Sequence, residues 1–448
     1  MRMSIENSAE ARFAQFATKQ CLDVLPKEVI DRTKEIILDT IGIMLRATTA
    51  PSLSNLRKAL VSRDSGNSTV FGSPFKATPS IAALLNASLP TITQYDEGHR
   101  IARGHPGIHI VPAAFAMGED KGVSGKDLIV AIVTGYEVAV RIAFSVYPMN
   151  PQIHSHGTWA TIGAAVSVGK ILCFTEKQFA DLINSISTLT LSTWSKATTS
   201  GATIHHLVPS LGASHAIIAA MATQAGLSGP PCCLEGHFIP LSSHHPNPEI
   251  PTDNLGSTYE ILSNYFKAYP ACAHIHSSIE ALENILASRP IILEDIEGVE
   301  VRTYPVASHL SEQNPVNTLA CIFSIPYCLG MWLLKRKLLI EAIATEAAID
   351  PQILKAASII RVVSDEHLKP SFPQGRPSLV RVRMKNGTEY EHFVALTRER
   401  LTKKELEEKF HQMVEPIIGK EHGEKLKKKI DDLENVSDIC QLSTLLSP

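Results

Sequence analysis

One short segment, residues 94–105, concentrates side chains that can move protons and bind anions. Carboxylates, imidazoles, a guanidinium and an amide follow one another there, at Gln94, Asp96, Glu97, His99, Arg100 and His105. Imidazole titrates near neutral pH, and arginine binds carboxylates through two parallel hydrogen bonds. The segment therefore predicts a site for proton transfer on an anionic ligand. A solvated, charged loop between helices is the alternative that the same composition allows.

Two further segments are rich in histidine. His154 and His156 precede a run of small residues that begins at Ala160, and His205 and His206 form a third pair. The small-residue run predicts a helix, and the free N–H groups at a helix N-terminus favour an anion such as a carboxylate. On residue types alone, these histidines could equally cap a helix or lie in a surface loop.

Lys267 lies in a fourth candidate segment, between Phe266 and Tyr269. The segment falls where helical patterns give way to strand patterns, so it marks a predicted domain boundary. A lysine at such a boundary can reach into the cleft between two domains, where ligands often bind. A surface lysine is the alternative.

Two His-x-His pairs, His154/His156 and His274/His276, raise the question of a metal. Residues two apart share a face in a strand but diverge in a helix, and the second pair begins a helical pattern. Neither a His-Glu-x-x-His motif nor a Cys-x-x-Cys pair accompanies them. The sequence therefore predicts no catalytic metal, and without a Gly-x-Gly-x-x-Gly or Walker motif it predicts no nucleotide cofactor.

The elements that would position these residues are helical in the first half of the chain. From Pro26 to Arg46 apolar residues recur three to four apart, as in a helix with one buried face. Later segments are rich in small residues, which let helices pack closely. These segments are 81–89, 111–117, 162–172 and 213–225.

Strand patterns appear after the proline-rich stretch 227–255. Residues 299–304 alternate apolar and polar, and residues 379–384 and 390–396 flank Asn386-Gly387, which predicts a hairpin. Thr402 with Glu405 then forms a capping box that predicts a new helix.

The predicted fold class is mainly α, with an all-helical domain and a smaller α+β lid domain inserted near the C-terminus. We assign residues 1–265 and 397–448 to the helical domain and residues 266–396 to the lid.

Composition narrows the functional classes. The chain has 448 residues, a formal charge of −3 and 19% charged residues, so it predicts a folded protein of two domains that binds no nucleic acid. The most apolar stretch, Leu128 to Val146, is interrupted by Glu137 and Arg141, which favours a buried helix over a membrane span. A polar N-terminal segment gives no sign of a signal peptide, so we expect a cytoplasmic enzyme.

In order and spacing, these segments resemble the MmgE/PrpD family, whose members include 2-methylcitrate dehydratase, cis-aconitate decarboxylase and iminodisuccinate epimerase. The resemblance implies a helical domain with an α+β lid, a homodimer, no cofactor, and a small anionic di- or tricarboxylate as substrate. It rests on His105-Pro106-Gly107, Gly163-Ala164-Ala165, Gly226 to Pro230, Lys267 to Pro270 and Phe323 to Tyr327.

The resemblance also assigns roles to single residues. The catalytic histidine of the family falls on His105, and a second active-site histidine falls on His154. A substrate-binding lysine falls on Lys267 and a lid tyrosine on Tyr327. A second family lysine would fall near His205, so a histidine takes that place here.

Two positions depart from the loop of the decarboxylases, which has aspartate where this chain has Gln94 and threonine where it has Gly98. We expect Lys267 and Arg100 to hold substrate carboxylates, with Gln94, His99, His205 and Tyr327 as further contacts. His105 and His154 would act on the reacting carbon. Asp96 or Glu97 would orient a histidine or assist a leaving hydroxyl group.

The sequence favours dehydration of a 2-methylcitrate-like hydroxy acid. Decarboxylation of a cis-aconitate-like acid is the first alternative and epimerisation the second. A binding protein that has lost its activity is the rival from another class, and the departures at Gln94 and Gly98 favour it.

Overall fold

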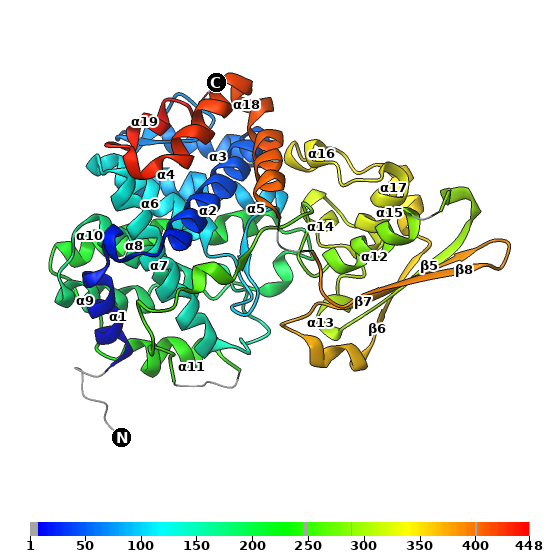
Figure 1. Cartoon of the computed structure of the whole chain (residues 1–448), viewed down its shortest axis with the longest axis horizontal. Coiled ribbons are helices and arrows are strands. Elements are labelled where there is room, and N and C mark those ends of the chain that lie inside the picture. Colours follow the sequence, from blue (N-terminus) through cyan, green and yellow to red (C-terminus); the bar gives the residue numbers. More distant parts are fainter. Residues whose placement is uncertain (1–7, 245–248, 288, 399–400, 448) are drawn as a thin grey trace.

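The computed structural model describes residues 8–244, 249–287, 289–398 and 401–447, which form a helical body and a smaller body around a sheet (Figure 1). The helical body contains the first part of the chain and its C-terminal helices, and the sheet lies in the part between them. The chain is therefore mainly α with a small α+β part toward the C-terminus, as the sequence predicts.

The helical body is built from helices of very different length, which come from the first part of the chain and from its C-terminal part. They are α1 (Ala9–Lys19), α2 (Lys27–Arg46), α3 (Pro51–Val61), α4 (Pro79–Ala87), α5 (Pro90–Thr93), α6 (Gly107–Lys121), α7 (Gly125–Val146), α8 (Trp159–Ile171), α9 (Glu176–Ser187), α10 (Leu207–Gln224), α11 (Ile239–Ser242), α18 (Lys403–Asp431) and α19 (Cys440–Ser443). Short strand pairs accompany them, β1 (Ser68–Thr69) with β2 (Lys76–Ala77), and β3 (Gly98–His99) with β4 (Asn264–Tyr265).

Small residues bring the central helices α7 and α8 into close contact, as the sequence predicts. A Cβ atom added at Gly135 would lie 2.3 Å from the carbonyl oxygen of Gly163, and one at Gly163 would lie 2.4 Å from that of Gly135. Any side chain at either position would therefore push the two helices apart.

Helix α7 is long and apolar enough to cross a membrane, but 94% of its most apolar window is buried inside the protein. Its charged residues Glu137 and Arg141 form a buried ion pair at 2.7 Å, which explains how a core helix tolerates them. The buried helix that the sequence predicts over this region is confirmed.

The smaller body packs short helices against one mixed sheet. Its strands are β5 (Ile296–Thr303), β6 (Ile360–Ser364), β7 (Ser378–Met384) and β8 (Glu389–Val394), in the order β6-β5-β7-β8. Strands β5 and β6 are parallel, and the other pairs are antiparallel. The helices are α12 (His276–Ala287), α13 (Pro305–Ser308), α14 (Thr318–Cys321), α15 (Ile325–Lys335), α16 (Ile340–Ala344) and α17 (Pro351–Ala357).

The hairpin and the capping box are where the sequence places them. Strands β7 and β8 flank Asn386-Gly387, and Gly387 has a φ of +85°, a left-handed conformation that glycine adopts without strain. Thr402 caps α18 by accepting from the N–H of Glu405, whose carboxylate bonds back to the N–H of Thr402.

Two hydrophobic cores underlie the two bodies. One contains residues from Ala9 to Phe266 and from Leu406 to Leu446, together with Ile340, and the other contains residues from Ala271 to Val394. Helix α18 returns the chain to the helical body, where it packs along α2 (Figure 1). The strand pair β3–β4 lies where the second core begins, so it places the loop after α5 beside the smaller body.

An apolar strip lies exposed on the outer side of α10. The side chains of Ile218 and Met221 are 51% and 53% exposed, and Leu227, just beyond the helix, is 63% exposed. Apolar side chains gathered at one surface are typical of protein interfaces. We propose that the chain forms a homodimer and that this strip contributes to the interface.

Sedimentation velocity at micromolar concentration should show a dimer for the parent protein and a monomer for Ile218→Glu/Met221→Glu, because a carboxylate buried in an apolar contact is costly. Phe393→Glu is the matched control, since Phe393 is 50% exposed on the sheet of the smaller body. A monomeric parent protein would contradict the homodimer, and a dimeric double variant would contradict this interface.

Candidate active site

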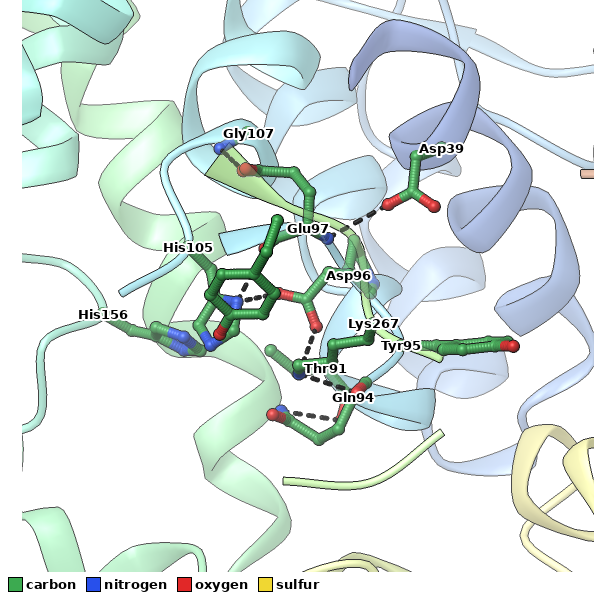
Figure 2. A network of polar contacts seen from close by, with 12 residues as sticks. Asp39, Thr91, Gln94, Tyr95, Asp96, Glu97, His105, Gly107, His156 and Lys267 are labelled. Carbon is green, nitrogen blue, oxygen red and sulfur yellow. Dashed lines mark hydrogen bonds and ion pairs between the residues drawn. The ribbon is translucent and has the colours of Figure 1, made fainter. Parts of the chain in front are cut away.

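The carboxylate of Asp96 lies at the centre of the candidate site and is almost completely buried, with 1% of the residue exposed. Its Oδ2 is 2.9 Å from Nδ1 of His105, and its Oδ1 is 3.2 Å from Nζ of Lys267 (Figure 2). Burial alone would raise the pKa of Asp96, but His105 and Lys267 hold that pKa well below its usual value. Asp96 is therefore an ionised carboxylate between two basic groups.

His105 is positioned by this carboxylate and by the backbone of its own loop. Its Nδ1 also lies 2.7 Å from the carbonyl oxygen of Glu97, so both neighbours of Nδ1 are acceptors and Nδ1 carries a proton. The other ring nitrogen, Nε2, is then the atom that can take up or give away a proton. A carboxylate beside Nδ1 orients the ring and leaves Nε2 as the nitrogen for proton transfer, which suits His105 for acid–base work.

The ammonium group of Lys267 is bonded within the protein. Lys267 is 0% exposed, and its Nζ donates to the carbonyl oxygen of Gln94 at 2.7 Å and to Asp96. Gln94 ends α5 in a left-handed conformation, with φ +48°, and its carbonyl oxygen accepts this bond. In this structure Lys267 neutralises Asp96, whereas the sequence leads us to expect it to hold a substrate carboxylate.

Glu97 points away from His105 and anchors the start of α6. Its Oε1 accepts the N–H of Gly107 at 2.6 Å (Figure 2). Its Oε2 accepts from the Tyr136 hydroxyl at 3.0 Å. Burial raises the pKa of Glu97 to about 8. A Cβ atom at Gly107 would lie 2.6 Å from Oε1, so only glycine leaves room for this bond.

A second buried ion pair holds the same loop from behind. Asp39 on α2 and Lys409 on α18 are 2.7 Å apart, and Asp39 accepts the N–H of Glu97 at 3.0 Å. Lys409 also donates to the carbonyl oxygens of Tyr95 at 2.7 Å and Lys267 at 3.2 Å. Helices that are far apart in the sequence therefore fix the backbone on both sides of Asp96.

Next to His105 lies a cluster of neutral histidines. The ring centres of His105 and His156 are 5.6 Å apart, and those of His156 and His154 are 4.5 Å apart. His205 stacks on His156 at 5.3 Å. Burial lowers the pKa of His154 to about 4 and those of His156 and His205 well below the usual value. Uncharged imidazoles therefore line one side of His105.

His154, His156 and His205 are close enough to raise the question of a metal, since one ligand atom from each lies within 4.8 Å of the others. Tetrahedral zinc with Zn–N bonds of about 2.05 Å needs nitrogens about 3.4 Å apart, so the rings would have to move together. The Nδ1 of His154 accepts the N–H of His156 at 3.1 Å, which leaves the proton on Nε2. In this arrangement His154 offers a metal no lone pair.

The turn that follows β3 carries Arg100 and is closed by His99. Nδ1 of His99 accepts the N–H of Ala102 at 3.1 Å, and its Nε2 lies 3.6 Å from Glu260. Arg100 donates from Nη1 to the carbonyl oxygen of Gln374 at 3.2 Å, in the smaller body. His99 thus shapes the turn, while Arg100 reaches across the junction.

Tyr327 lies elsewhere. It belongs to the apolar core of the smaller body, is 5% exposed, and its N–H is capped by Ser324 at the start of α15. Its raised pKa arises from burial and from the neighbouring Cys321. Among the described residues, no hydrogen bond joins Tyr327 to the residues around His105, where a contact was expected.

Comparison with known proteins finds two family domains in the chain. The MmgE/PrpD N-terminal domain matches residues 11–248, and the MmgE/PrpD C-terminal domain matches residues 269–435. The chain belongs to the MmgE/PrpD family. Among curated relatives, a cis-aconitate decarboxylase of Aspergillus terreus (strain NIH 2624 / FGSC A1156) is 22% identical over 99% of this chain and 96% of its own length. The cis-aconitate decarboxylase of Homo sapiens is 25% identical over 94% and 91%.

In this MmgE/PrpD chain, most of the residues expected at the site are neighbours. The structure brings together Gln94, Asp96, His105, His154, His205 and Lys267. It turns the carboxyl group of Glu97 toward Gly107, uses His99 to shape a turn, and leaves Tyr327 in another core.

Some residues of the site were not predicted from the sequence. His156 lies in a segment that we singled out, but Asp39 and Lys409 look like ordinary helix positions. The sequence did offer one indication for Asp39 and Lys409: each is a charged residue at a helix position that the spacing of apolar residues predicts to be buried.

The pH dependence of stability tests the neutral histidines, with His109 as the clearest case. Its Nδ1 bonds to the carbonyl oxygen of His105 and its Nε2 accepts the N–H of Gly157, so only the neutral ring satisfies both. Burial lowers the pKa of His109 to about 4, below the ordinary 6.5. The unfolded chain therefore binds more protons between these values, and stability is lost as the pH falls from 6.5 toward 4.

Urea unfolding between pH 7.5 and 4.5 should show this loss. In His109→Asn the slope below pH 6.5 should be smaller by up to about 1.4 kcal/mol per pH unit, although the variant is less stable at pH 7.5. His392→Asn, at an exposed position on β8, should keep the parent slope. An unchanged slope in His109→Asn would show that His109 is not held neutral.

Replacing Lys409 tests the second ion pair. Lys409→Met leaves the carboxylate of Asp39 buried without its ammonium partner, which should lower the free energy of unfolding by about 3–5 kcal/mol. Lys404→Met, on the same helix with its side chain 85% exposed, is the control and should change it by less than about 0.5 kcal/mol. Equal stability of the two variants would mean that the pair does not hold the loop.

Proposed function

We propose that this chain is a lyase that acts without a cofactor on a small polycarboxylate, with His105 as the group that transfers the proton. The observation that carries the proposal is the buried Asp96–His105 pair, which leaves Nε2 as the reactive ring nitrogen. The relatives named cis-aconitate decarboxylase, which span nearly the whole chain, support a carboxylate substrate. A cytoplasmic location is part of the same proposal.

Decarboxylation of a cis-aconitate-like acid is the reaction that we favour. The bond between a carbon and its carboxylate breaks, CO2 leaves, and the electron pair is delocalised through the double bond onto a neighbouring carboxylate. The imidazolium of His105 then delivers its Nε2 proton to carbon, and Asp96 stabilises that cation beforehand. The decarboxylation needs one proton donor, and His105 is positioned to supply the proton.

Dehydration of a hydroxy acid, which the sequence favours, is the second candidate. It needs a base for the C–H bond and an acid for the leaving hydroxyl, and the carboxyl group of Glu97 is bonded to Gly107 and Tyr136 instead. The observation that supports dehydration is the hydroxyl of Tyr265. A Cβ atom placed on Gly98 would lie 2.7 Å from it and 3.0 Å from Nδ1 of His105, so this hydroxyl lies near His105, where it would serve as the acid.

NMR spectroscopy in D2O tests the proposal and separates the reactions. With propene-1,2,3-tricarboxylate, we expect release of CO2 and incorporation of one deuterium, whereas a 2-methylcitrate-like acid would yield a new alkene only if the enzyme is a dehydratase. His105→Asn should lower the rate by about 10²–10⁴-fold, the usual contribution of a general acid.

His392→Asn again supplies the control, because this histidine is exposed on β8, which lies at one edge of the sheet in the smaller body. The proposal fails if the parent protein converts neither propene-1,2,3-tricarboxylate nor the 2-methylcitrate-like acid to a product. Turnover that survives in His105→Asn would instead assign the proton transfer to another group.

A further inference from the structure

Two cysteines border one open groove of the helical body. Cys21 follows α1 and Cys173 follows α8, and both are exposed, whereas the other cysteines of the chain are half-buried or buried. The groove has a volume of about 530 Å³ and also touches the start of α7. Among the described residues that line it, none belongs to the active site. The groove therefore holds two nucleophilic side chains that the proposed reaction does not use.

Lys170 joins the two turns that carry these cysteines. It lies in the last turn of α8, and its Nζ donates to the carbonyl oxygen of Ala17 at 2.8 Å and to that of Thr18 at 3.4 Å, both at the end of α1. Burial lowers the pKa of Lys170, and the negative charge of a thiolate at Cys173, and then at Cys21, opposes this shift. Both sulfur atoms therefore lie within the electrostatic reach of one ammonium group.

The turn after α8 holds Cys173 in a conformation that helix ends usually give to glycine. The N–H of Cys173 donates to the carbonyl oxygen of Lys170 at 3.1 Å, and the N–H of Phe174 donates to that of Gly169 at 3.1 Å. This pair of bonds ends many helices, and it places Cys173 at a φ of +55°, which strains a residue that has a Cβ atom. A glycine would relieve the strain but would remove the thiol from the groove.

Two thiols beside one ammonium group suit thiol–disulfide exchange. The attacking species in this reaction is a thiolate, which a neighbouring positive charge favours, and a second thiol can displace the first product. Soft metal ions also bind thiolates. However, no third histidine, cysteine or carboxylate among the described residues completes a metal site around this pair. The residue types therefore favour a small disulfide over a metal as the reactant.

We propose that Cys21 and Cys173 form a thiol pair that reacts with low-molecular-weight disulfides and closes into a disulfide bond. The bond would join the connection between α1 and α2 to the turn after α8. This proposal is independent of the proposed reaction at His105, because it uses other residues in another part of the helical body.

The exchange takes place in two steps. The thiolate of Cys173 attacks one sulfur of the small disulfide, whose S–S bond breaks, and a first small thiolate leaves with the proton that Cys173 gave up. The sulfur of Cys21 then attacks that of Cys173, and the second small thiolate leaves with the proton of Cys21. Two protein thiols are thereby oxidised, and one small disulfide is reduced to two thiols.

The surroundings decide which form the pair adopts. A reducing compartment keeps both thiols free, and the bond closes only when small disulfides accumulate. Closure also needs the two Cα atoms to come within about 7 Å of each other, so formation of the bond measures how closely the two turns approach.

Mass spectrometry after incubation with glutathione disulfide tests the pair. The parent protein should become lighter by two hydrogen atoms, and digestion without reductant should yield one cross-linked peptide that contains Cys21 and Cys173. The Tm should rise by about 4 °C or more, since the bond closes a long loop, and dithiothreitol should reverse both changes.

Single variants separate a pair from two independent thiols. Cys21→Ser should keep one glutathionyl group on Cys173, because no second thiol displaces it, and Cys173→Ser should keep one on Cys21. Cys232→Ser is the matched control, since Cys232 is half-buried and lies outside the groove, and it should close the bond like the parent protein.

A further pair of variants tests the ammonium group. Lys170→Met should slow closure by about three- to tenfold, because the thiolate loses its positive neighbour. Lys177→Met, on α9 with its side chain 84% exposed, should keep the parent rate. Equal rates in the two variants would contradict the role of Lys170.

Three results would overturn the thiol pair. Parent protein that carries a glutathionyl group on both cysteines would show that the sulfur atoms cannot meet. Parent protein that does not react at either cysteine would show that the groove excludes small disulfides. A cross-linked peptide that contains any other cysteine would assign the bond elsewhere. None of these measurements needs turnover of a carboxylate, so they leave the proposed function to its own test.

Discussion

The burial of an ionised carboxylate, Asp96, is the constraint on which the arrangement of this molecule depends. A charge removed from water must be paired and hydrogen-bonded, and the two partners of Asp96 come from different segments of the chain. His105 lies just before α6, and Lys267 follows β4. Because both contact Asp96, they draw the helical body and the start of the smaller body to one point. The second pair, Asp39 with Lys409, explains why the chain returns as α18, since Lys409 donates to the carbonyl oxygen of Tyr95 before Asp96 and Asp39 accepts the N–H of Glu97 after it.

The sequence was informative wherever local spacing decides structure. The apolar spacing of α2, the Asn386-Gly387 hairpin and the Thr402 cap each follow from neighbouring residues, and each is present. Residue types also located the segment 94–105 and the histidine pairs. Spacing could not reveal which distant side chains would meet, because a buried lysine and a surface lysine have the same local pattern. The direction of Lys267, the anchoring role of Glu97 and the placement of Tyr327 depend on tertiary contacts.

His105 lies between two unlike surroundings. On one side are the imidazoles of His154, His156 and His205, which burial keeps neutral. On the other side are the Tyr265 hydroxyl and the guanidinium groups beyond it. Two segments of the helical body supply the neutral side, whereas the positive side needs Arg376 from the smaller body. The junction of the two bodies is therefore what makes the two sides of His105 differ.

This asymmetry has a consequence for the direction in which a substrate would lie. A carboxylate among guanidinium groups is stabilised as an anion, so losing it as CO2 would forfeit that stabilisation. A carboxylate beside neutral imidazoles gains little from its charge, and its conversion to neutral CO2 costs correspondingly less. In the proposed decarboxylation, the reacting carboxylate would therefore lie on the histidine side of His105. The carbon that receives the proton would then lie next to Nε2 of His105, because Nδ1 faces Asp96 and the carbonyl oxygen of Glu97.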